Sequence, residues 1–365
     1  MAATDPLRLA LTHPYSWPEV RRGAERIIHE LSRALAARGH TVTVYTAGRA
    51  PGVSSDSGVT TVRLRRRVTS ESRHERLFGI SLTPRLLARR YDAVHSLGTR
   101  DAVASIRAAR LLPRPHRTVY TNLGNPVRDW WDGRPDGRAQ RRIVRDVDVY
   151  GCMSRYSLRV LRETYGREGA LTPGGVSLEQ FQPQAAREPT PTILFSGALS
   201  EPRKGVAILL DALAILLRTT PDMRLWLSGP GDAAALLDHA PASVREHVDV
   251  LPLGDPMLQA ERYGRAWVMT LPSRGDSFGM VVVEALACGT PVAVSGDAAL
   301  PELVTAGETG AVCDAGSAES VAEAISTCLE LASKPGTAAA CRASAEPFDW
   351  KTGIAPAFEK LYAAG

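Results

Sequence analysis

Short apolar, strand-like runs alternate with helix-like segments along this sequence, and that alternation constrains the fold more than any other feature. The first unit has the apolar run Leu7–Leu11, an apolar helical pattern over 24–35 and the β-branched run Thr41–Tyr45. Further apolar runs follow at 93–95, 118–120 and 147–150, with helix-compatible segments between them. Such alternation predicts a parallel sheet with helices on both faces.

A second series of the same kind begins near Pro191. Its predicted elements are the strands 192–196, 224–228, 266–271 and 292–295, with a helix over 205–218. Between the two series lie the Pro- and Gly-rich stretches Thr172–Pro183 and Arg187–Pro191, which indicate a linker. The sequence therefore predicts two tandem, doubly wound Rossmann-like α/β domains, residues 1–185 and 186–349. Ligands of such folds bind beyond the carboxyl ends of the strands, so we expect the reaction in a cleft between the domains.

Composition excludes several classes of protein. No apolar stretch approaches the roughly 18–20 residues that cross a bilayer. The N-terminus shows no basic region followed by an apolar core, so no secretory signal is predicted. The five cysteines are scattered without a Cys-x-x-Cys pair. We therefore expect neither a disulfide framework nor a zinc site, and a cytoplasmic location.

Charge is distributed unevenly along the chain. Residues 1–185 contain 31 Arg and no Lys against 17 acidic residues, whereas residues 186–365 contain 13 basic and 22 acidic residues. A basic first half is typical of proteins with an anionic partner, although solvated arginines account for most of it. The Arg-rich stretches 63–67 and 85–90 lack interleaved aromatic residues, so nucleic-acid binding is not predicted. A basic helix over Leu82–Tyr91 leaves open a peripheral contact with the inner face of the membrane.

The segment Leu271–Pro291 carries the strongest chemical signal. A strand ends at Leu271, and after a loop a helix begins near Phe278 that is apolar nearly all round and therefore buried. Glu284 lies in the middle of this helix. An unpaired buried carboxylate is costly, so Glu284 requires a partner, either a basic side chain or the hydroxyl groups of a ligand.

Two neighbouring features favour a ligand. Asp276 lies in the loop before the helix, about two turns from Glu284. Between them, Phe278, Gly279 and Met280 offer backbone N–H groups at a helix N-terminus, which suits a phosphate, and Gly279 allows close approach. Carboxylates for sugar hydroxyls and amides for a diphosphate together indicate a nucleotide-sugar site.

The block Asp276–Val292 resembles the E-x7-E motif of glycosyltransferase family 4, retaining enzymes of the GT-B fold. Shorter similarities extend the resemblance over nearly the whole chain: Gly39–Val44, Asp92–His95, the linker Thr172–Pro183, the loop Phe195–Gly205, and the ending from Phe348-Asp-Trp350, which is similar to a C-terminal helix (about 350–365) that returns to the first domain.

The resemblance implies roles for individual residues. Asp276 would contact the donor sugar and Glu284 the ribose, while the amides of Phe278 and Gly279 would bind the sugar and β-phosphate. Lys204 would neutralise the departing diphosphate, and Gly23 would approach it from the first domain. Family enzymes are thought to react by front-face attack, which requires no protein nucleophile, metal or cofactor.

The chain also departs from the family pattern. Asp276 stands where Glu is usual, and Ala198 where the family has a phosphate-binding Arg, for which Arg203 is the candidate substitute. Arg22 occupies the first position of the usual Gly-Gly pair. The family's His in the first domain is replaced in Thr121-Asn-Leu-Gly-Asn125.

Because of these departures, acceptor recognition is the property that the family resemblance predicts least well. Asn122, Asn125 and Arg128 are its candidates, and the neighbouring Trp130-Trp131 could stack on a sugar, although covering the core is the better interpretation. His13 follows the first strand and is a candidate for the reacting site, with a structural histidine as the equal alternative. Asp146-Val-Asp148 imitates a metal-binding D-x-D motif but precedes its strand, which favours a solvated strand edge.

The sequence thus predicts a retaining glycosyltransferase that moves a sugar from a nucleoside-diphosphate sugar to a hydroxyl or amine. The acceptor is a natural product, a glycolipid or glycoside, or a polysaccharide precursor. Alternatives are another GT-B enzyme, such as a sugar phosphorylase or an epimerase, and a non-catalytic sugar-nucleotide-binding partner subunit. The sequence specifies neither the base nor the sugar.

Overall fold

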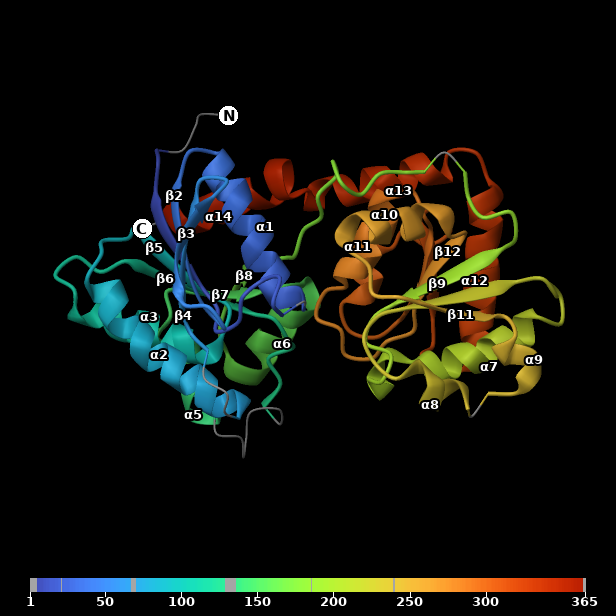
Figure 1. The fold of residues 1–365 in the computed structure, drawn as a ribbon, viewed down its shortest axis with the longest axis horizontal. Helices are drawn as coiled ribbons and strands as arrows, with labels where there is room; N and C mark the ends of the chain where they lie inside the picture. Colours follow the sequence, from blue (N-terminus) through green and yellow to red (C-terminus); the bar gives the residue numbers. More distant parts are fainter. Residues whose placement is uncertain are drawn as a thin grey trace. The chain divides into compact units, whose positions relative to one another are not determined.

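The computed structural model describes residues 5–20, 22–66, 70–128, 136–184, 186–238 and 240–363. Contacts between Cα atoms divide the chain into two compact units. The first comprises Met1–Gly174 together with Trp350–Gly365, and the second comprises Gly175–Asp349. Each unit is an α/β sandwich around one sheet (Figure 1). Together with the structural comparisons reported below, this confirms the predicted pair of Rossmann-like domains.

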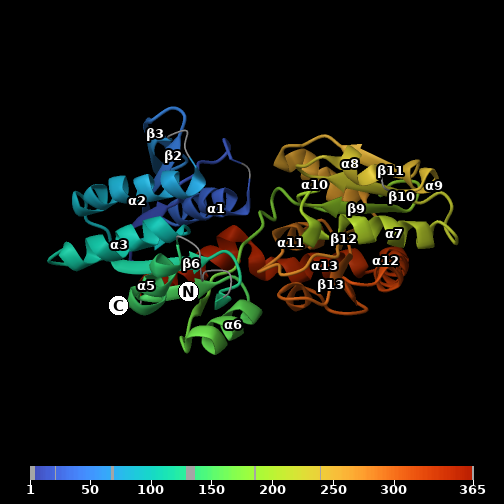
Figure 2. The same cartoon turned by 90° about the horizontal axis from the view of Figure 1, so that it is seen from below.

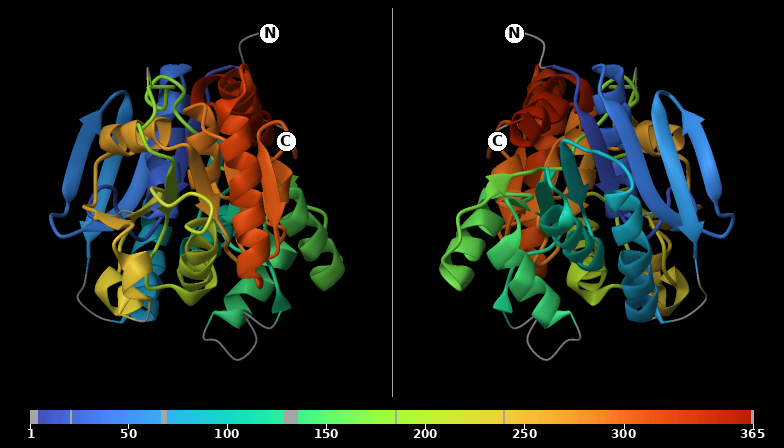
Figure 3. Two further views of the ribbon diagram at one scale, coloured as in Figure 1. Left: turned by 90° about the vertical axis from the view of Figure 1, so that its right-hand side faces the viewer. Right: turned by 90° about the vertical axis from the view of Figure 1, so that its left-hand side faces the viewer.

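The sheet of the first unit has the strand order β3-β4-β2-β1-β5-β6-β7-β8. Neighbouring strands are parallel, except that β3 and β4 form an antiparallel hairpin at one edge (Figure 3, right panel). Val59 is buried on β4, whereas β3 is exposed throughout. The hairpin therefore extends the sheet beyond the strands that the helices cover. The strands are β1 (Arg8–Thr12), β2 (Thr41–Gly48), β3 (Gly52–Asp56), β4 (Val59–Arg65), β5 (Ala93–Ser96), β6 (Arg117–Asn122), β7 (Val149–Cys152) and β8 (Ala170–Leu171).

Helices cover both faces of this sheet. α1 (Gly23–Ala37) lies with the C-terminal helix α14 (Ala355–Ala363) on one face, and α2 (Glu71–Leu87) and α3 (Thr99–Leu111) pack together on the other (Figures 1 and 2). α5 (Gly137–Asp146) packs on α3, and α6 (Arg155–Tyr165) follows β7. Leu31 and Leu35 of α1, and Phe78 and Leu82 of α2, are fully or almost fully buried, as their helical spacing predicts.

Polar contacts within the first unit attach α14 to the sheet and to α1. Glu359 accepts hydrogen bonds from Arg38 and lies 2.9 Å from His40 Nε2. The Tyr362 hydroxyl lies 2.8 Å from His95 Nδ1. α14 follows the π-helical turn η4 (Trp350–Ile354). The last residues of the chain therefore belong to the first unit.

The second unit contains a six-stranded, all-parallel sheet with the order β11-β10-β9-β12-β13-β14. Its strands are β9 (Thr192–Ser196), β10 (Arg224–Ser228), β11 (Val248–Leu251), β12 (Val268–Leu271), β13 (Val292–Ser295) and β14 (Gly310–Cys313). Four of them, β9, β10, β12 and β13, are largely buried, which is why they are almost continuous apolar runs in the sequence.

The helices of the second unit also occupy both faces of its sheet. α7 (Val206–Leu216) packs on α12 (Ala318–Ser333), and α10 (Pro256–Arg265) packs on α11 (Met280–Ala287) (Figure 2). The other elements are α8 (Ala233–Leu237), α9 (Ala242–Arg245), α13 (Thr337–Ala345) and the 3-10 turns η1 (Pro202–Lys204), η2 (Leu300–Leu303) and η3 (Glu346–Phe348).

The division between the units falls after Gly174, earlier than the boundary at residue 185 that the sequence suggested. Val176 N donates to the Phe348 carbonyl over 2.9 Å, and Leu178 N donates to Asp349 Oδ1 over 3.2 Å. The Pro- and Gly-rich stretch Thr172–Pro183 therefore belongs to the second unit from Gly175 onward.

Most strands lie where the apolar runs predicted them, whereas the β3–β4 hairpin was missed because its strands are short of apolar residues. Among the described residues, no helix has the length and apolar character that crossing a bilayer requires.

Candidate functional site

Asp276 is the centre of the most highly charged cluster in the predicted donor segment. Its carboxylate is largely buried and accepts hydrogen bonds from two cations: Arg203 Nη1 lies 2.7 Å from Oδ1, and Lys204 Nζ lies 2.8 Å from Oδ1 and 3.0 Å from Oδ2. Burial by itself raises the pKa of Asp276, but Lys204 and Arg203 outweigh it and the pKa falls below 3.8. The group is therefore ionised at neutral pH.

The backbone explains how two residues of η1 reach a loop that follows β12. Gly205 ends η1 with φ 76°, a left-handed conformation that favours glycine. A Cβ atom at Gly205 would overlap the Pro272 carbonyl, so only glycine permits this close approach. Arg274 N also donates to the Arg203 carbonyl over 2.8 Å. The two loops are thus joined by backbone contacts as well as by the ion pairs.

The loop after β12 is held from its other side as well. Gly275 N donates to Asp297 Oδ2 over 2.9 Å, and Ala299 N donates to the Asp276 carbonyl over 3.1 Å. The backbone N–H of Gly275 and the carbonyl of Asp276 are both hydrogen-bonded, so the loop that carries the Asp276 side chain is fixed on this side as well.

The helix α11 begins at Met280 after Gly279, which has φ 109°. This left-handed conformation favours glycine, and a Cβ atom here would also lie 2.6 Å from a Leu300 methyl carbon of η2. Phe278 is buried with its ring against Phe348, at 5.5 Å between centroids. The N–H groups in the first turn of a helix have no partner within the helix, and they carry the positive end of its dipole. This turn is therefore suited to an anion.

Glu284 is buried inside α11, as its apolar surroundings predicted. The Tyr263 hydroxyl, from α10, lies 3.1 Å from Glu284 Oε2, to which it donates, and 3.1 Å from Ser196 Oγ at the end of β9. A neutral hydroxyl thus contacts this carboxylate. Tyr263 was not singled out from the sequence, because nothing in its local pattern shows that it faces a residue on another helix.

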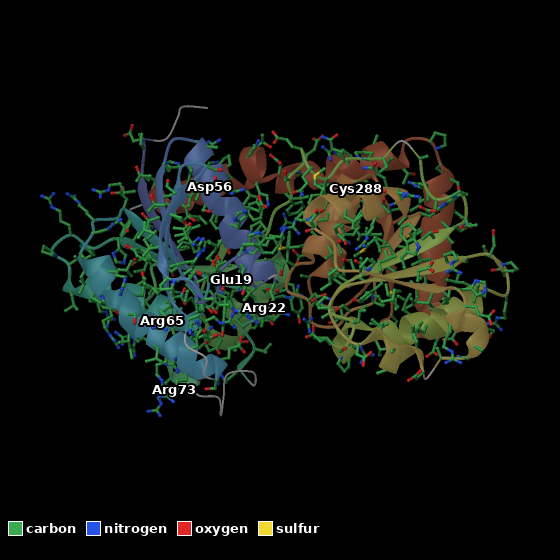
Figure 4. The ribbon with its side chains drawn as sticks, in the orientation of Figure 1. Glu19, Arg22, Asp56, Arg65, Arg73 and Cys288 are labelled. Carbon is green, nitrogen blue, oxygen red and sulfur yellow. The ribbon has the colours of Figure 1, made fainter. Side chains whose placement is uncertain are left out.

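The predicted residues of the first unit lie at the carboxyl ends of its strands. His13 follows β1 and is buried, with Nδ1 3.9 Å from Glu25 Oε1. Burial lowers the pKa of His13, and Glu25 opposes the shift only in part. Gly23 is exposed and begins α1, next to Arg22, which pairs with Glu25 at 3.1 Å (Figure 4 labels Arg22). Glu25 thus connects His13 to the first turn of α1, the helix that Gly23 begins.

The three candidate acceptor residues differ in their surroundings. Asn122 ends β6, is buried, and its Nδ2 has no hydrogen-bond partner. Asn125 Oδ1 accepts from Ser157 Oγ over 2.7 Å. Arg128 Nη2 donates to the Thr164 carbonyl, and its guanidinium lies 5.9 Å from the centre of the Tyr165 ring. The Arg128 side chain thus contacts the C-terminal end of α6. Trp130 and Trp131 lie outside the described residues.

Asp146 and Asp148 have protein partners. Asp146 pairs with Arg110, Arg142 and Arg145. Asp148 Oδ2 accepts from the backbone and hydroxyl of Thr118, at 2.8 and 2.7 Å. Asp146 ends α5 with its side chain 7% exposed, whereas Asp148 is exposed at the entry of β7, so only Asp148 fits the predicted solvated strand edge.

Comparison with known proteins decides the family. The model described as "Glycosyl transferases group 1" matches residues 190–331, and the one described as "Glycosyltransferase Family 4" matches residues 21–180. The two matches cover the cores of the two units. The chain belongs to glycosyltransferase family 4.

Relatives of this transferase include the phosphatidyl-myo-inositol mannosyltransferase of Mycobacterium leprae. The two are 28% identical over 348 residues, which cover 87% of this chain and 86% of the relative.

The solved structures establish the GT-B fold. Sucrose-phosphate synthase from Thermosynechococcus elongatus matches the transferase with a TM-score of 0.82 at 21% identity, covering 98% of both chains. Anabaena HepE in complex with UDP-glucose matches with a TM-score of 0.74 at 18% identity, covering 97% of this chain and 99% of that one.

Proposed function

We propose that this transferase moves a sugar from a nucleoside-diphosphate sugar to an acceptor hydroxyl or amine, with retention of anomeric configuration. The observation that carries the proposal is the grouping of Lys204 and Arg203 around Asp276, shortly before the N-terminus of α11. Two cations and a helix start match a diphosphate, while buried carboxylates match the hydroxyl groups of a sugar nucleotide.

In this proposal Lys204 and Arg203 bind the diphosphate together with backbone N–H groups of Phe278, Gly279 and Met280. Lys204 is the less exposed cation, at 15% of its side chain against 44% for Arg203. A buried cation interacts more strongly with charge that grows during the reaction. Lys204 therefore stabilises the departing diphosphate more in the transition state than in the ground state.

Asp276 and Glu284 recognise hydroxyl groups of the donor, Asp276 on the sugar and Glu284 on the ribose. Asp276 stands where the family has Glu, and its shorter side chain is already bonded to Lys204 and Arg203. Donor phosphates would share these cations with Asp276, which frees carboxylate oxygens for the sugar. Arg203 thereby takes the place of the arginine that Ala198 lacks.

On the acceptor side we propose Asn122, Asn125 and Arg128, with His13 at the reacting site and Gly23 approaching the donor diphosphate. The role of Asn122 is best supported. Its buried Nδ2 has no hydrogen-bond partner among the described residues, which is costly, and an oxygen of the acceptor substrate would accept its hydrogen bond. His13 has a lowered pKa through burial, so its ring is neutral at pH 7 and either donates or accepts a hydrogen bond. Attack occurs on the donor's front face, with a phosphate oxygen taking the acceptor proton. The proposal includes no protein nucleophile, metal or cofactor.

The test is an incubation of the purified chain with UDP-, GDP- and ADP-sugars without an acceptor. One donor should be hydrolysed slowly to its nucleoside diphosphate, and a non-catalytic binder would release none. A parallel incubation with inorganic phosphate detects a phosphorylase through formation of a sugar phosphate. Nuclear magnetic resonance of the anomeric proton, once an acceptor is found, tests retention.

The acceptor panel begins from the relatives. One relative is the phosphatidyl-myo-inositol mannosyltransferase of Mycobacterium leprae, so inositol, inositol phosphate and phosphatidylinositol vesicles are the first acceptors in the panel, followed by simple glycosides. Transfer to the vesicles alone would support a peripheral membrane contact. The five cysteines are buried and unpaired, which supports a cytoplasmic location.

A further inference from the structure

A cavity of about 240 Å³ lies within the first unit, between α1 and the outer part of the sheet. Its helical wall consists of Glu25, Ile28, His29, Ser32 and Arg33, whose spacing places them on one side of α1. This side differs from the apolar stripe that faces the core. The cavity exists because polar side chains here occupy a surface that apolar ones usually fill.

The opposite wall is one face of two paired strands. Val44 and Thr46 of β2 alternate along the strand, and they pair in register with Thr61 and Arg63 of β4, so all four point to the same side of the sheet. Tyr15 and Trp17, from the segment between β1 and α1, also line the cavity. The walls thus combine aromatic rings, aliphatic carbons and hydroxyl groups.

Within the part of the chain that the structure describes, two buried side chains in this lining each have an oxygen without a hydrogen-bond partner. Glu25 is 2% exposed and its Oε2 has none, although Oε1 pairs with Arg22. Thr46 is 3% exposed and its Oγ1 has none. A buried polar group without a hydrogen-bond partner is destabilising. A ligand that donates hydrogen bonds would remove both penalties.

The charges in the lining cancel, Glu25 and Asp56 against Arg33 and Arg63, and this favours a neutral ligand. Arg33 pairs with Asp56 of β3, and Arg22 compensates Glu25 (Figure 4 labels Arg22 and Asp56, toward opposite ends of α1). Burial lowers the pKa of His29 to about 4, so this ring is uncharged at neutral pH and offers one donor and one acceptor nitrogen.

We propose that this cavity binds one polyhydroxylated ring, a sugar residue or a cyclitol. Hydroxyl groups of the ring donate to Glu25 Oε2 and exchange hydrogen bonds with Thr46 Oγ1, while the Trp17 ring covers an aliphatic face. The volume is below the roughly 300–1,000 Å³ of pockets for drug-sized ligands, which restricts the ligand to one ring. The proposal is independent of the donor site, since all of these residues belong to the first unit.

Saturation-transfer nuclear magnetic resonance of the full chain, without any nucleotide, tests the proposal with glucose and myo-inositol as probes. Signal transfer to the ring protons of at least one probe is expected. Thr61→Phe fills the cavity and should abolish it, whereas Thr60→Phe places the same ring on the opposite face of β4 and should leave it unchanged. Thr46→Val should weaken binding about 2- to 10-fold, the effect of one neutral hydrogen bond, and Thr43→Val on the other face of β2 should not.

Further probes distinguish the form of the ring. Methyl glucoside that binds like glucose indicates a terminal residue of a larger molecule, whereas binding of glucose alone indicates a free sugar, and either supports the site. Three outcomes overturn it: no transfer to any probe, equal transfer in Thr61→Phe and Thr60→Phe when both melt like the wild type, or binding only of the ammonium-bearing glucosamine. Since donor turnover does not enter these measurements, failure here is separate from failure of the proposed transferase reaction.

Discussion

Lys204 Nζ lies 2.8 Å from Asp276 Oδ1, although 72 residues separate the two in the chain. The pair joins the turn after β9 to the loop after β12, and the close approach of Gly205 to Pro272 holds the two loops together. In the proposed reaction, Lys204 faces the diphosphate and Asp276 faces the sugar, so this one contact connects both halves of the donor.

Replacing Lys204 tests its role in the reaction. We expect Lys204→Ala to lower donor turnover about 10²–10³-fold, as loss of one preorganised donor to a developing anion does. Lys334→Ala, at an exposed position, is the matched control and should turn over normally. Initial rates of nucleoside diphosphate release measure both. Equal rates for the wild type and Lys204→Ala would exclude this lysine from the reaction.

Glu284→Gln tests the buried carboxylate. The amide oxygen of Gln still accepts from the Tyr263 hydroxyl, so the fold should persist, but the charge that binds the donor ribose is gone. Nucleoside diphosphate at about 100 times its dissociation constant should stabilise the wild type by about 2.7 kcal/mol. It should stabilise the variant far less in the same thermal-shift assay. Glu323→Gln, at an exposed position on α12, should respond like the wild type, and a full response of Glu284→Gln would contradict the assignment.

The pH dependence of stability reports on Asp276. Its pKa in the folded state is below 3.8 because Lys204 and Arg203 outweigh burial. The ionised carboxylate therefore contributes stability above the unfolded-state pKa, and this contribution is lost as pH falls through the folded-state value. The difference in unfolding free energy between wild type and Asp276→Asn should stay constant from neutral pH down to about pH 4 and shrink below it. Urea unfolding at several pH values measures this difference in unfolding free energy. A difference that stays the same below about pH 4 would contradict the ion pairs.

Asp101 gives the opposite dependence. It is buried in α3, accepts from Thr12 Oγ1 over 2.7 Å, and burial raises its pKa from 3.8 to about 8. Because the pKa is raised, the contribution of Asp101 to the unfolding free energy is fully present below the unfolded-state pKa. It is lost as pH rises toward 8. Asp101→Asn keeps an oxygen for Thr12 but does not ionise. Its stability relative to the wild type should rise between pH 4 and pH 8, and urea midpoints that run parallel over this range would rule the explanation out.

Glu359 tests how α14 is attached. We expect Glu359→Gln to lower the unfolding free energy by about 1–3 kcal/mol, because Arg38 and His40 lose a charged partner in a buried setting. Lys360→Gln changes the adjacent exposed residue and should have almost no effect. Thermal unfolding followed by circular dichroism measures both, and identical midpoints would show that α14 depends on its apolar contacts alone.

The sequence by itself determined what depends on local pattern. Buried parallel strands are continuous apolar runs, so Thr192–Ser196 and Val292–Ser295 were identified without coordinates. The donor segment was equally accessible, because Asp276, Gly279 and Glu284 lie within one contiguous stretch whose helix leaves a single acid among apolar residues. The hairpin β3–β4 was missed, because its exposed residues show no apolar alternation.

Only the tertiary structure decided which residues meet. The pairing of Lys204 with Asp276, the hydroxyl of Tyr263 on Glu284, and the cavity between α1 and β4 each join segments far apart in the chain. Such contacts depend on strand order, register and helix packing, which arise from the whole folded unit and leave no trace in the local periodicity of a sequence. Local pattern therefore specified the elements and the chemical character of the donor loop, and packing specified the partners of each side chain.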